Sequence, residues 1–171
     1  MKKIIAILML LVLALSVVSC RKTDAPDGMK NASGENAKYY LYVPESWYEQ
    51  TEINSATSPM RDGANVNATT YLADTVYTPV TYWETKALPE INVAFDNVVV
   101  VAAECGETDL GGLKAMRYVY DATLGGVSYR FMQIITVNSN MVYTLTYTAK
   151  PENYATHLED VESIRAAFTF K

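Results

Sequence analysis

The sequence predicts an α+β domain with a central, mostly antiparallel β-sheet flanked by helices. Several segments alternate between two sets of side chains with the period of two that marks a strand, most clearly residues 141–148. Short turn sequences separate these segments, and strands joined by short turns must pair antiparallel. Two other segments, after Thr78 and after Pro151, carry apolar residues at helical spacing. This order of elements predicts an antiparallel sheet with helices packed on it.

The strands of the first half are less regular than those of the second. We expect one strand over residues 39–43, ended by Pro44, and another over residues 65–71. The segment between them is rich in turn residues. Residues 98–103 form a continuous apolar run of strand length, which predicts a central strand covered on both faces.

The second half of the chain predicts a run of hairpins. Residues 114–121 alternate, and Gly125-Gly126 is typical of a two-residue hairpin turn that leads into a strand over residues 127–137. The Asn-Ser-Asn sequence at 138–140 predicts a second turn, followed by the strand over residues 141–148.

Two helices are expected. Thr78 and Pro79 suit the N-cap and the first position of a helix, and Pro89 predicts that this helix ends near residue 88. Pro151 and Glu152 open the second, which leads into a short extended end at residues 168–170. The apolar stripe of the second helix comprises Tyr154, Leu158, Val161, Ile164 and Phe168.

The N-terminal segment has the organisation of a secretory signal. Lys2 and Lys3 precede an uncharged apolar run, and small residues lead to Cys20. Its last residues, Val-Val-Ser-Cys, resemble a bacterial lipobox. That resemblance implies cleavage before Cys20, a diacylglyceryl group on its sulfur, and a protein anchored to the extracytoplasmic face of a cell membrane. An uncleaved anchor is the alternative, although the run is shorter than the roughly 20 residues that a spanning helix needs.

Three regions follow from this interpretation: a signal peptide over residues 1–19, the lipidated Cys20 with a flexible tether over residues 20–38, and one domain over residues 39–171. The mature chain would carry twelve Lys and Arg against nineteen Asp and Glu, a net charge of −7. An acidic chain without a basic cluster argues against binding to nucleic acid. With Cys20 lipidated, Cys105 has no cysteine partner, so the fold must depend on its core.

The order and spacing of several fold-forming residues resemble the PsbP/Mog1-like superfamily. They are Tyr42-Val43-Pro44 with Trp47, Asn65-Val66-Asn67, Tyr143 with Leu145-Thr146-Tyr147, and the closing helix with Phe168 and Phe170. The resemblance covers about residues 39–171 and implies an α/β/α sandwich. It supplies no catalytic residues, since members act chiefly as binding and assembly subunits.

Few residues could carry chemistry. Cys105 and His157 are the one thiol and imidazole that could form a nucleophile and base, and a small residue at a strand end is the alternative for Cys105. Glu104, Glu107 and Asp109 could together hold a hard cation, or form a solvated acidic turn. Their spacing lacks the pattern of a calcium loop, and no zinc set, phosphate loop or nucleophile elbow occurs. We therefore expect no cofactor.

The aromatic residues offer a possible recognition surface. Trp47 and Trp83 are expected in the core, whereas Tyr77 and Tyr82 are the candidates for a partner surface. The functional expectation is a non-enzymatic binding or assembly module with an envelope protein as its partner. The alternatives are a small solute- or metal-binding lipoprotein and a small hydrolase that uses Cys105 and His157.

Overall fold

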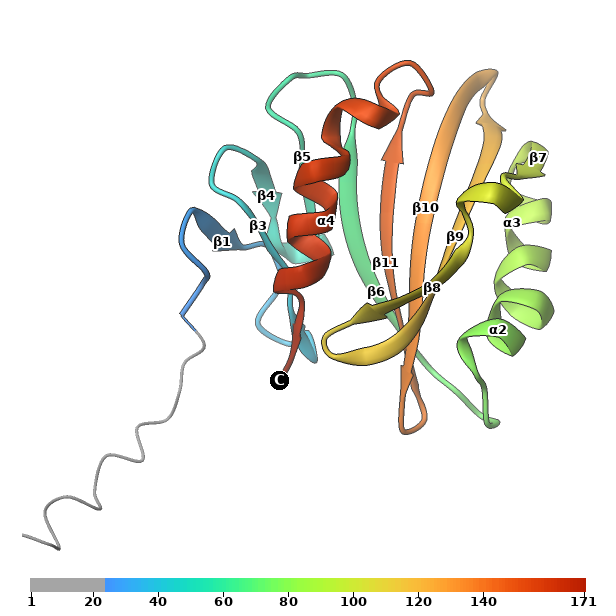
Figure 1. Ribbon diagram of the computed structural model, residues 1–171, viewed down its shortest axis with the longest axis horizontal. Helices are drawn as coiled ribbons and strands as arrows, with labels where there is room; N and C mark the ends of the chain where they lie inside the picture. Colours follow the sequence, from blue (N-terminus) through green and yellow to red (C-terminus); the bar gives the residue numbers. More distant parts are fainter. Residues whose placement is uncertain (1–23) are drawn as a thin grey trace, which may run out of the picture.

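A computed structural model describes residues 24–171 as a domain built around an eight-stranded sheet (Figure 1). The strands are β4 (Tyr48–Gln50), β5 (Ser55–Thr57), β6 (Asn65–Leu72), β7 (Asp96–Val100), β8 (Gly106–Leu110), β9 (Leu113–Leu124), β10 (Val127–Asn138) and β11 (Met141–Ala149). Their spatial order is β4-β5-β6-β11-β10-β9-β7, and β8 pairs separately with β9. The pairs in this sheet are antiparallel, which confirms the predicted α+β class.

The two predicted hairpin turns join the central strands. Gly125 and Gly126 have φ angles of 59° and 83°, and Leu124 pairs with Val127 across the turn. Two successive positive φ angles give the turn whose twist matches the strands, and glycine adopts them without a steric cost. At the next turn Asn138 pairs with Met141, as expected from the Asn-Ser-Asn sequence.

Helices cover the two faces of this sheet. One face carries α2 (Pro79–Tyr82), the π-helical turn η2 (Trp83–Ala87) and α3 (Leu88–Ala94), and the other carries η4 (Tyr154–His157) and α4 (Leu158–Ala167) (Figure 1). We call these the α3 face and the α4 face. Because side chains alternate along a strand, β10 sends Phe131 and Ile135 to the α3 face and Met132 and Ile134 to the α4 face.

The ordered domain begins earlier than predicted. β1 (Met29–Asn31) pairs with β3 (Tyr42–Pro44), and the backbone N–H of Ala32 donates to Leu41 O at 2.7 Å. Ala32 is fully buried in the core of the α4 face. The expectation of a tether as far as residue 38 is therefore wrong for residues 29–38. Backbone pairing, which the polar composition of this stretch does not reveal, holds it in place. The predicted signal peptide and Cys20 lie outside the described residues.

The C-terminal end also joins the fold. β12 (Thr169–Phe170) pairs with β2 (Tyr39–Tyr40), which confirms the extended end predicted for this segment. Of the predicted apolar stripe on the last helix, four residues are buried and Leu158 is half-buried against the same core. The sequence pattern thus identified the packed side of α4 correctly.

The first helix does not end before Pro89 as expected. It continues through α3 to Ala94, because the turn η2 changes the hydrogen-bond pattern: the N–H of Leu88 bonds to Trp83 O, five residues back. Pro89 then lies in the first turn of α3, where a missing N–H group costs little. A helix can therefore pass this proline.

The apolar run near residue 100 forms an edge strand, so the prediction of a central strand is wrong. β7 pairs with β9, with a register shift between Asp96 and Val99, and the short 3₁₀ turn η3 (Ala102–Glu104) follows it. The side chain of Val99 is 61% exposed. A second such turn, η1 (Thr51–Ile53), precedes β5. Over residues 24–171, no helix has the length and apolar content to span a bilayer.

Candidate functional site

The structure does not pair Cys105 with His157. The Sγ atom of Cys105 accepts a hydrogen bond from Val119 N–H at 3.3 Å, whereas Nε2 of His157 lies 2.6 Å from Asp62 Oδ2. Ser58 Oγ lies 3.4 Å from the same Nε2. A Ser-His-Asp triad needs the acid and the hydroxyl on opposite ring nitrogens, so this cluster lacks that geometry. His157 is buried and connects the loop that carries Ser58 and Asp62 to η4.

Two of the three residues in the predicted acidic cluster form ion pairs with arginines. Glu104 lies 3.3 Å from Arg130 Nη1 and Asp109 lies 2.7 Å from Arg165 Nη1, while Glu107 is exposed on β8. In the part of the chain that the structure describes, no three His, Cys, Asp or Glu side chains gather as metal ligands would. Glu104, Glu107 and Asp109 therefore do not form the predicted cation site.

Of the two tyrosines predicted for a partner surface, Tyr82 is buried. Its ring packs edge-on against Tyr77 at 5.4 Å between centroids, because residue 82 lies on the side of α2 that faces the sheet. Tyr77 is half-buried and keeps part of its ring accessible. The tryptophans are buried as expected: Trp47 is fully enclosed, and Trp83 stacks on Tyr118 at 4.2 Å.

The main candidate site is a groove on the α3 face, which we call the sheet-face groove. It encloses about 420 Å³ between the α3 helix and the exposed part of the sheet. Its floor consists of polar residues on three adjacent strands, in which Thr146 of β11 pairs with Asn67 of β6 and with Gln133 of β10. The lining comprises Asn67, Thr69, Tyr82, Ala87, Glu90, Ile91, Ala94, Phe95, Tyr120, Phe131, Gln133, Thr144, Thr146 and Thr148.

The alternation of β11 builds this floor. Thr144, Thr146 and Thr148 face the groove, while Leu145 and Tyr147 between them are buried on the α4 face. Threonine suits a strand because its branched side chain packs on a pleated surface, and its hydroxyl can both donate and accept. The strand is therefore apolar where α4 covers it and polar where the α3 helix leaves it open.

An aromatic wall borders the polar floor. Phe131 stacks on Tyr120 at 4.9 Å and contacts Phe95 at 5.2 Å between ring centroids. Burial raises the pKa of Tyr120, so its hydroxyl stays protonated at neutral pH. The wall offers apolar area and ring edges beside the hydroxyl groups of the floor.

The polar groups of the groove include one that the fold leaves unpaired. The Oε1 atom of Gln133 is buried and has no hydrogen-bond partner among the described residues. Such atoms are rare in folded proteins because a buried acceptor without a donor costs free energy. Glu90 is the single charged residue among the lining residues described, and Lys86 Nζ pairs with it at 2.8 Å. The groove is thus suited to binding an uncharged, hydrogen-bonding ligand.

This groove was not predicted from the sequence. The alternating Thr144, Thr146 and Thr148 are visible in the sequence. The residues that pair with Thr146 across the sheet, Asn67 and Gln133, lie on other strands. Only the register of β6, β11 and β10 brings them together. A period-two pattern with hydroxyl groups in place of apolar residues on one face would have been the signal for an uncovered sheet face.

Solved structures share this fold at low sequence identity. LpqN, involved in cell envelope biogenesis of Mycobacterium tuberculosis, superposes with a TM-score of 0.62 and 14% identity over 84% of this chain and 90% of that chain. CyanoP, the cyanobacterial PsbP of Synechocystis sp. PCC 6803, gives a TM-score of 0.58 and 12% identity over 91% of this chain and 99% of that chain. PA94 of Pseudomonas aeruginosa, a protein of unknown function, gives 0.53 and 18% identity over 79% and 92%.

No protein-family model and no curated protein sequence matches the chain. At these identities the likeness concerns the fold. The order of the elements, the antiparallel sheet and the two helical layers agree with the architecture implied by the sequence motifs around Trp47, Tyr143 and Phe168. The chain therefore has the PsbP/Mog1-like fold, which it shares with CyanoP and with the envelope protein LpqN.

Proposed function

We propose that this protein is a lipid-anchored lipoprotein on the extracytoplasmic face of a cell membrane, where it acts as a non-enzymatic binding or assembly module. The sheet-face groove is its binding surface. The observation that carries this proposal is the open polar floor around Thr146, next to an aromatic wall and the unpaired Oε1 of Gln133. Hydrogen-bonding groups beside apolar area are typical of binding pockets.

The proposed location is supported by two independent observations. The sequence before Cys20 resembles a lipobox, and LpqN, a protein of the same fold, is involved in cell envelope biogenesis. The proposed binding role is supported by the composition of the groove, since its described lining consists mainly of uncharged hydrogen-bonding and aromatic residues. A small-solute receptor would use the same groove and is the second candidate.

The first experiment is proximity crosslinking of the intact lipoprotein in its host, read by mass spectrometry. We compare it with Cys20→Ala, which removes the proposed lipid site, and with Thr146→Arg, which places a long charged side chain in the groove. Thr70→Arg is the matched control, because Thr70 is an exposed threonine of the neighbouring strand β6 and does not line the groove.

The expected result is a small set of envelope proteins captured by the wild type and by Thr70→Arg, and lost from both other variants. Equal capture by Thr146→Arg and the wild type would exclude the groove as the binding surface. If no protein is captured by any form, titration of the intact lipoprotein with small uncharged solutes tests the second candidate. If a solute binds and Thr146→Arg does not lower its affinity, the groove is excluded as the solute-binding site.

A further inference from the structure

The sheet-face groove has two sides of different chemistry. Its floor on the strands is polar, whereas the side formed by the α3 helix is largely apolar and includes Ala87, Ile91, Ala94 and Phe95. Its volume of about 420 Å³ lies within the range of about 300–1,000 Å³ that is typical of small-molecule sites. A ligand that fills the groove must therefore present polar groups to one side and apolar atoms to the other.

The fold leaves most polar side chains of the floor unused. Among residues 24–171, these side chains make no hydrogen bond with one another or with any other residue, and each keeps part of its surface exposed. The side chains in question are those of Asn67, Thr69, Thr144, Thr146 and Thr148. Their donors and acceptors are therefore available to a ligand that enters the groove.

The sheet sets the spacing of these groups. Thr144 pairs with Thr69 and Thr146 pairs with Asn67 across the boundary between β11 and β6. Neighbouring strands lie about 5 Å apart, and residues two positions apart on one strand are separated by about 7 Å. Hydroxyl groups on opposite sides of a pyranose ring are separated by a distance similar to the first of these. Several hydroxyl groups of one sugar residue can therefore contact the floor together.

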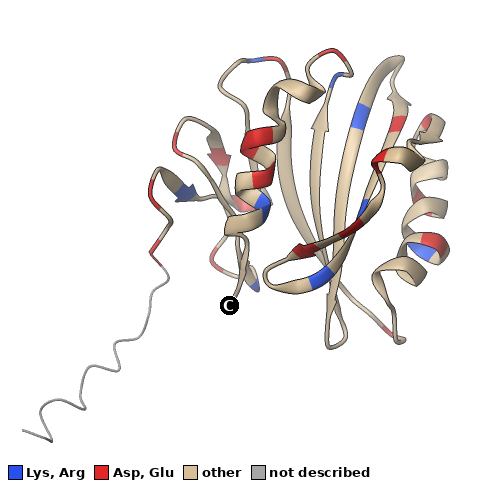
Figure 2. Cartoon of the chain, in the orientation of Figure 1, with Lys and Arg blue, Asp and Glu red and all other residues tan. Residues whose placement is uncertain are grey.

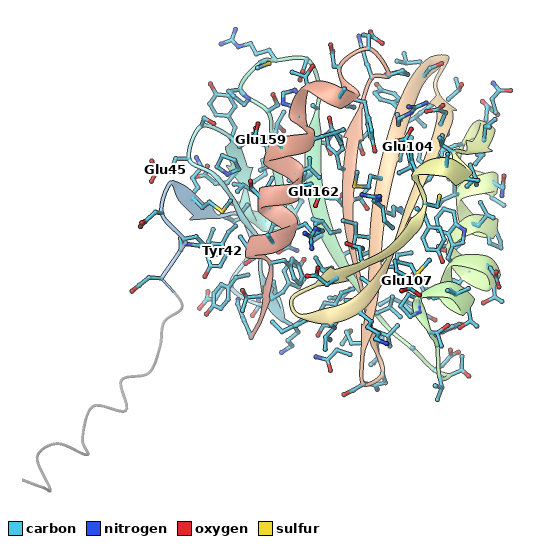
Figure 3. The ribbon with its side chains drawn as sticks, in the orientation of Figure 1. Tyr42, Glu45, Glu104, Glu107, Glu159 and Glu162 are labelled. Atoms are coloured by element: carbon cyan, nitrogen blue, oxygen red, sulfur yellow. The ribbon has the colours of Figure 1, made fainter. Side chains whose placement is uncertain are left out.

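The charge of the groove favours a neutral ligand. Its one charged lining residue among those described, Glu90, is paired with Lys86 Nζ at 2.8 Å. Figure 2 shows β6 and β11 without a charged residue. The four glutamates that Figure 3 labels on η3, β8 and α4 do not line the groove; they are Glu104, Glu107, Glu159 and Glu162. A charged ligand would lose water here without gaining an opposite charge, which costs free energy.

The hydrogen-bonding groups of the floor match hydroxyl groups better than other neutral groups. A threonine hydroxyl both donates and accepts, and so does the amide of Asn67. A sugar hydroxyl does the same, whereas a lipid chain offers no hydrogen bond. An extended peptide gains its affinity from backbone pairing at the edge of a sheet, but this groove lies on the face of the sheet. The C–H groups of a sugar ring suit the apolar side, where Ile91 and the half-buried Phe95 lie.

We propose that the sheet-face groove binds a neutral saccharide, with its hydroxyl groups on the threonine floor and its C–H groups against Ile91 and Phe95. This inference rests on the proposed function, because it takes the same groove as the binding surface. The same chemistry occurs in a free sugar and in a residue of a longer glycan chain, and the test separates these two sources.

The test is an NMR titration of the purified intact lipoprotein in a detergent without a sugar head group. The probes are glucose, galactose, mannose and N-acetylglucosamine, each as the monosaccharide and as a linear trisaccharide. Saturable binding of at least one probe is expected. Thr146→Val removes one hydroxyl from the floor and should lower the affinity about three- to tenfold. Thr70→Val makes the same change on β6 outside the groove and should leave the affinity unchanged. Valine suits a strand as well as threonine does, so both variants should fold.

The two sources of the saccharide differ in how the affinity depends on length. Equal affinity for the monosaccharide and its trisaccharide indicates a free sugar, and an affinity that rises with length indicates a glycan chain. The inference is overturned if no probe saturates, or if Thr146→Val binds as tightly as Thr70→Val. Capture of envelope proteins that is lost in Thr146→Arg, combined with no saccharide binding, would overturn the saccharide and leave the proposed function standing.

Discussion

At the scale of single residues, the buried imidazole of His157 organises the loop between β5 and β6. Its Nε2 contacts both Ser58 and Asp62, and the ring of Trp47 packs edge-on against it at 5.7 Å between centroids. Ser58 in turn accepts the backbone N–H of Met60 at 3.1 Å. A histidine that could have served as a base is therefore a structural link between this loop and η4.

The Asp62 carboxylate makes this link dependent on pH. Burial raises its pKa, but hydrogen bonds from His157 and the N–H of Ala64 outweigh that effect and leave the pKa below its ordinary value. A carboxyl group whose pKa is lowered by folding stabilises the fold above its unfolded pKa, near 4. We expect this contribution to disappear as the pH falls through the folded pKa.

Chemical denaturation across pH 2 to 7 measures this effect. Asp62→Asn should be less stable than the wild type at pH 7 by about 1–3 kcal/mol, because His157 loses its charged partner. The difference should shrink toward pH 2. A constant difference at every pH would show that the charge of Asp62 has no part in the effect.

The Trp47 indole both packs in the core and donates a hydrogen bond. Its side chain is fully buried, and Nε1–H donates to Asp160 Oδ2 at 2.9 Å. Trp47→Ala should lower the free energy of unfolding by about 3–5 kcal/mol, as large core truncations do. Asp160→Ala removes only the acceptor and should cost less, about 1–3 kcal/mol. Equal losses in the two variants, measured by denaturant titration, would contradict a dominant role for packing.

At the scale of elements, the turn between β8 and β9 depends on a close approach of the C-terminal strand. Gly111 has a φ of 58°, and a Cβ atom there would lie 2.5 Å from a ring carbon of Phe170. Gly112, with a φ of 78°, has open space around it. A side chain is unfavourable at both positions because of the positive φ angle. At Gly111 it would also clash with Phe170.

We therefore expect Gly111→Ala to be more destabilising than Gly112→Ala. Each should cost about 1–2 kcal/mol for the backbone angle. Gly111→Ala should also displace Phe170 from Tyr143, with which it makes an edge contact at 4.7 Å, and loosen the β2–β12 pair. Hydrogen exchange at residues 169–170 measures the second effect. Unchanged exchange in Gly111→Ala would mean that the Phe170 ring can move aside freely.

The success of prediction from sequence differed between elements for physical reasons. β11 and the Gly125-Gly126 turn were predictable because their signals are local: strict alternation and a backbone angle that favours glycine. β1 was missed because its sequence is polar and its place depends on pairing with β3. β7 was misassigned as central because its valines resemble a buried strand, although one of them is 61% exposed at the edge.

The missed strand leads to a test of where the domain starts. A chain that begins at Tyr39, as the sequence alone suggested, would lose β1 and the buried Ala32. Its free energy of unfolding should fall by several kcal/mol relative to a chain that begins at Asp24, since a strand pair and core contacts are removed. Thermal unfolding of the two chains decides the matter. Equal melting temperatures would mean that β1 adds nothing to the stability.

At the scale of the whole molecule, the early start of the domain limits how far it could lie from the proposed lipid anchor at Cys20. Eight residues lie between Cys20 and Met29, where β1 begins. Even fully extended, a segment of this length spans at most about 30 Å. If Cys20 carries the lipid, the domain must remain beside the bilayer surface, which favours partners that also lie close to the membrane.

Lengthening this connection tests whether proximity to the membrane matters. A 20-residue Gly/Ser segment inserted after Ala25 would add a flexible span of about 25 Å without touching β1, whose pairing starts at Met29. Folding should be unaffected, which thermal unfolding verifies. Capture of a membrane-proximal partner by crosslinking should fall, because the longer linker lowers the effective concentration of the domain near the surface. Undiminished capture by this variant, with the Cys20→Ala variant still inactive, would show that membrane attachment matters but that the length of the connection does not.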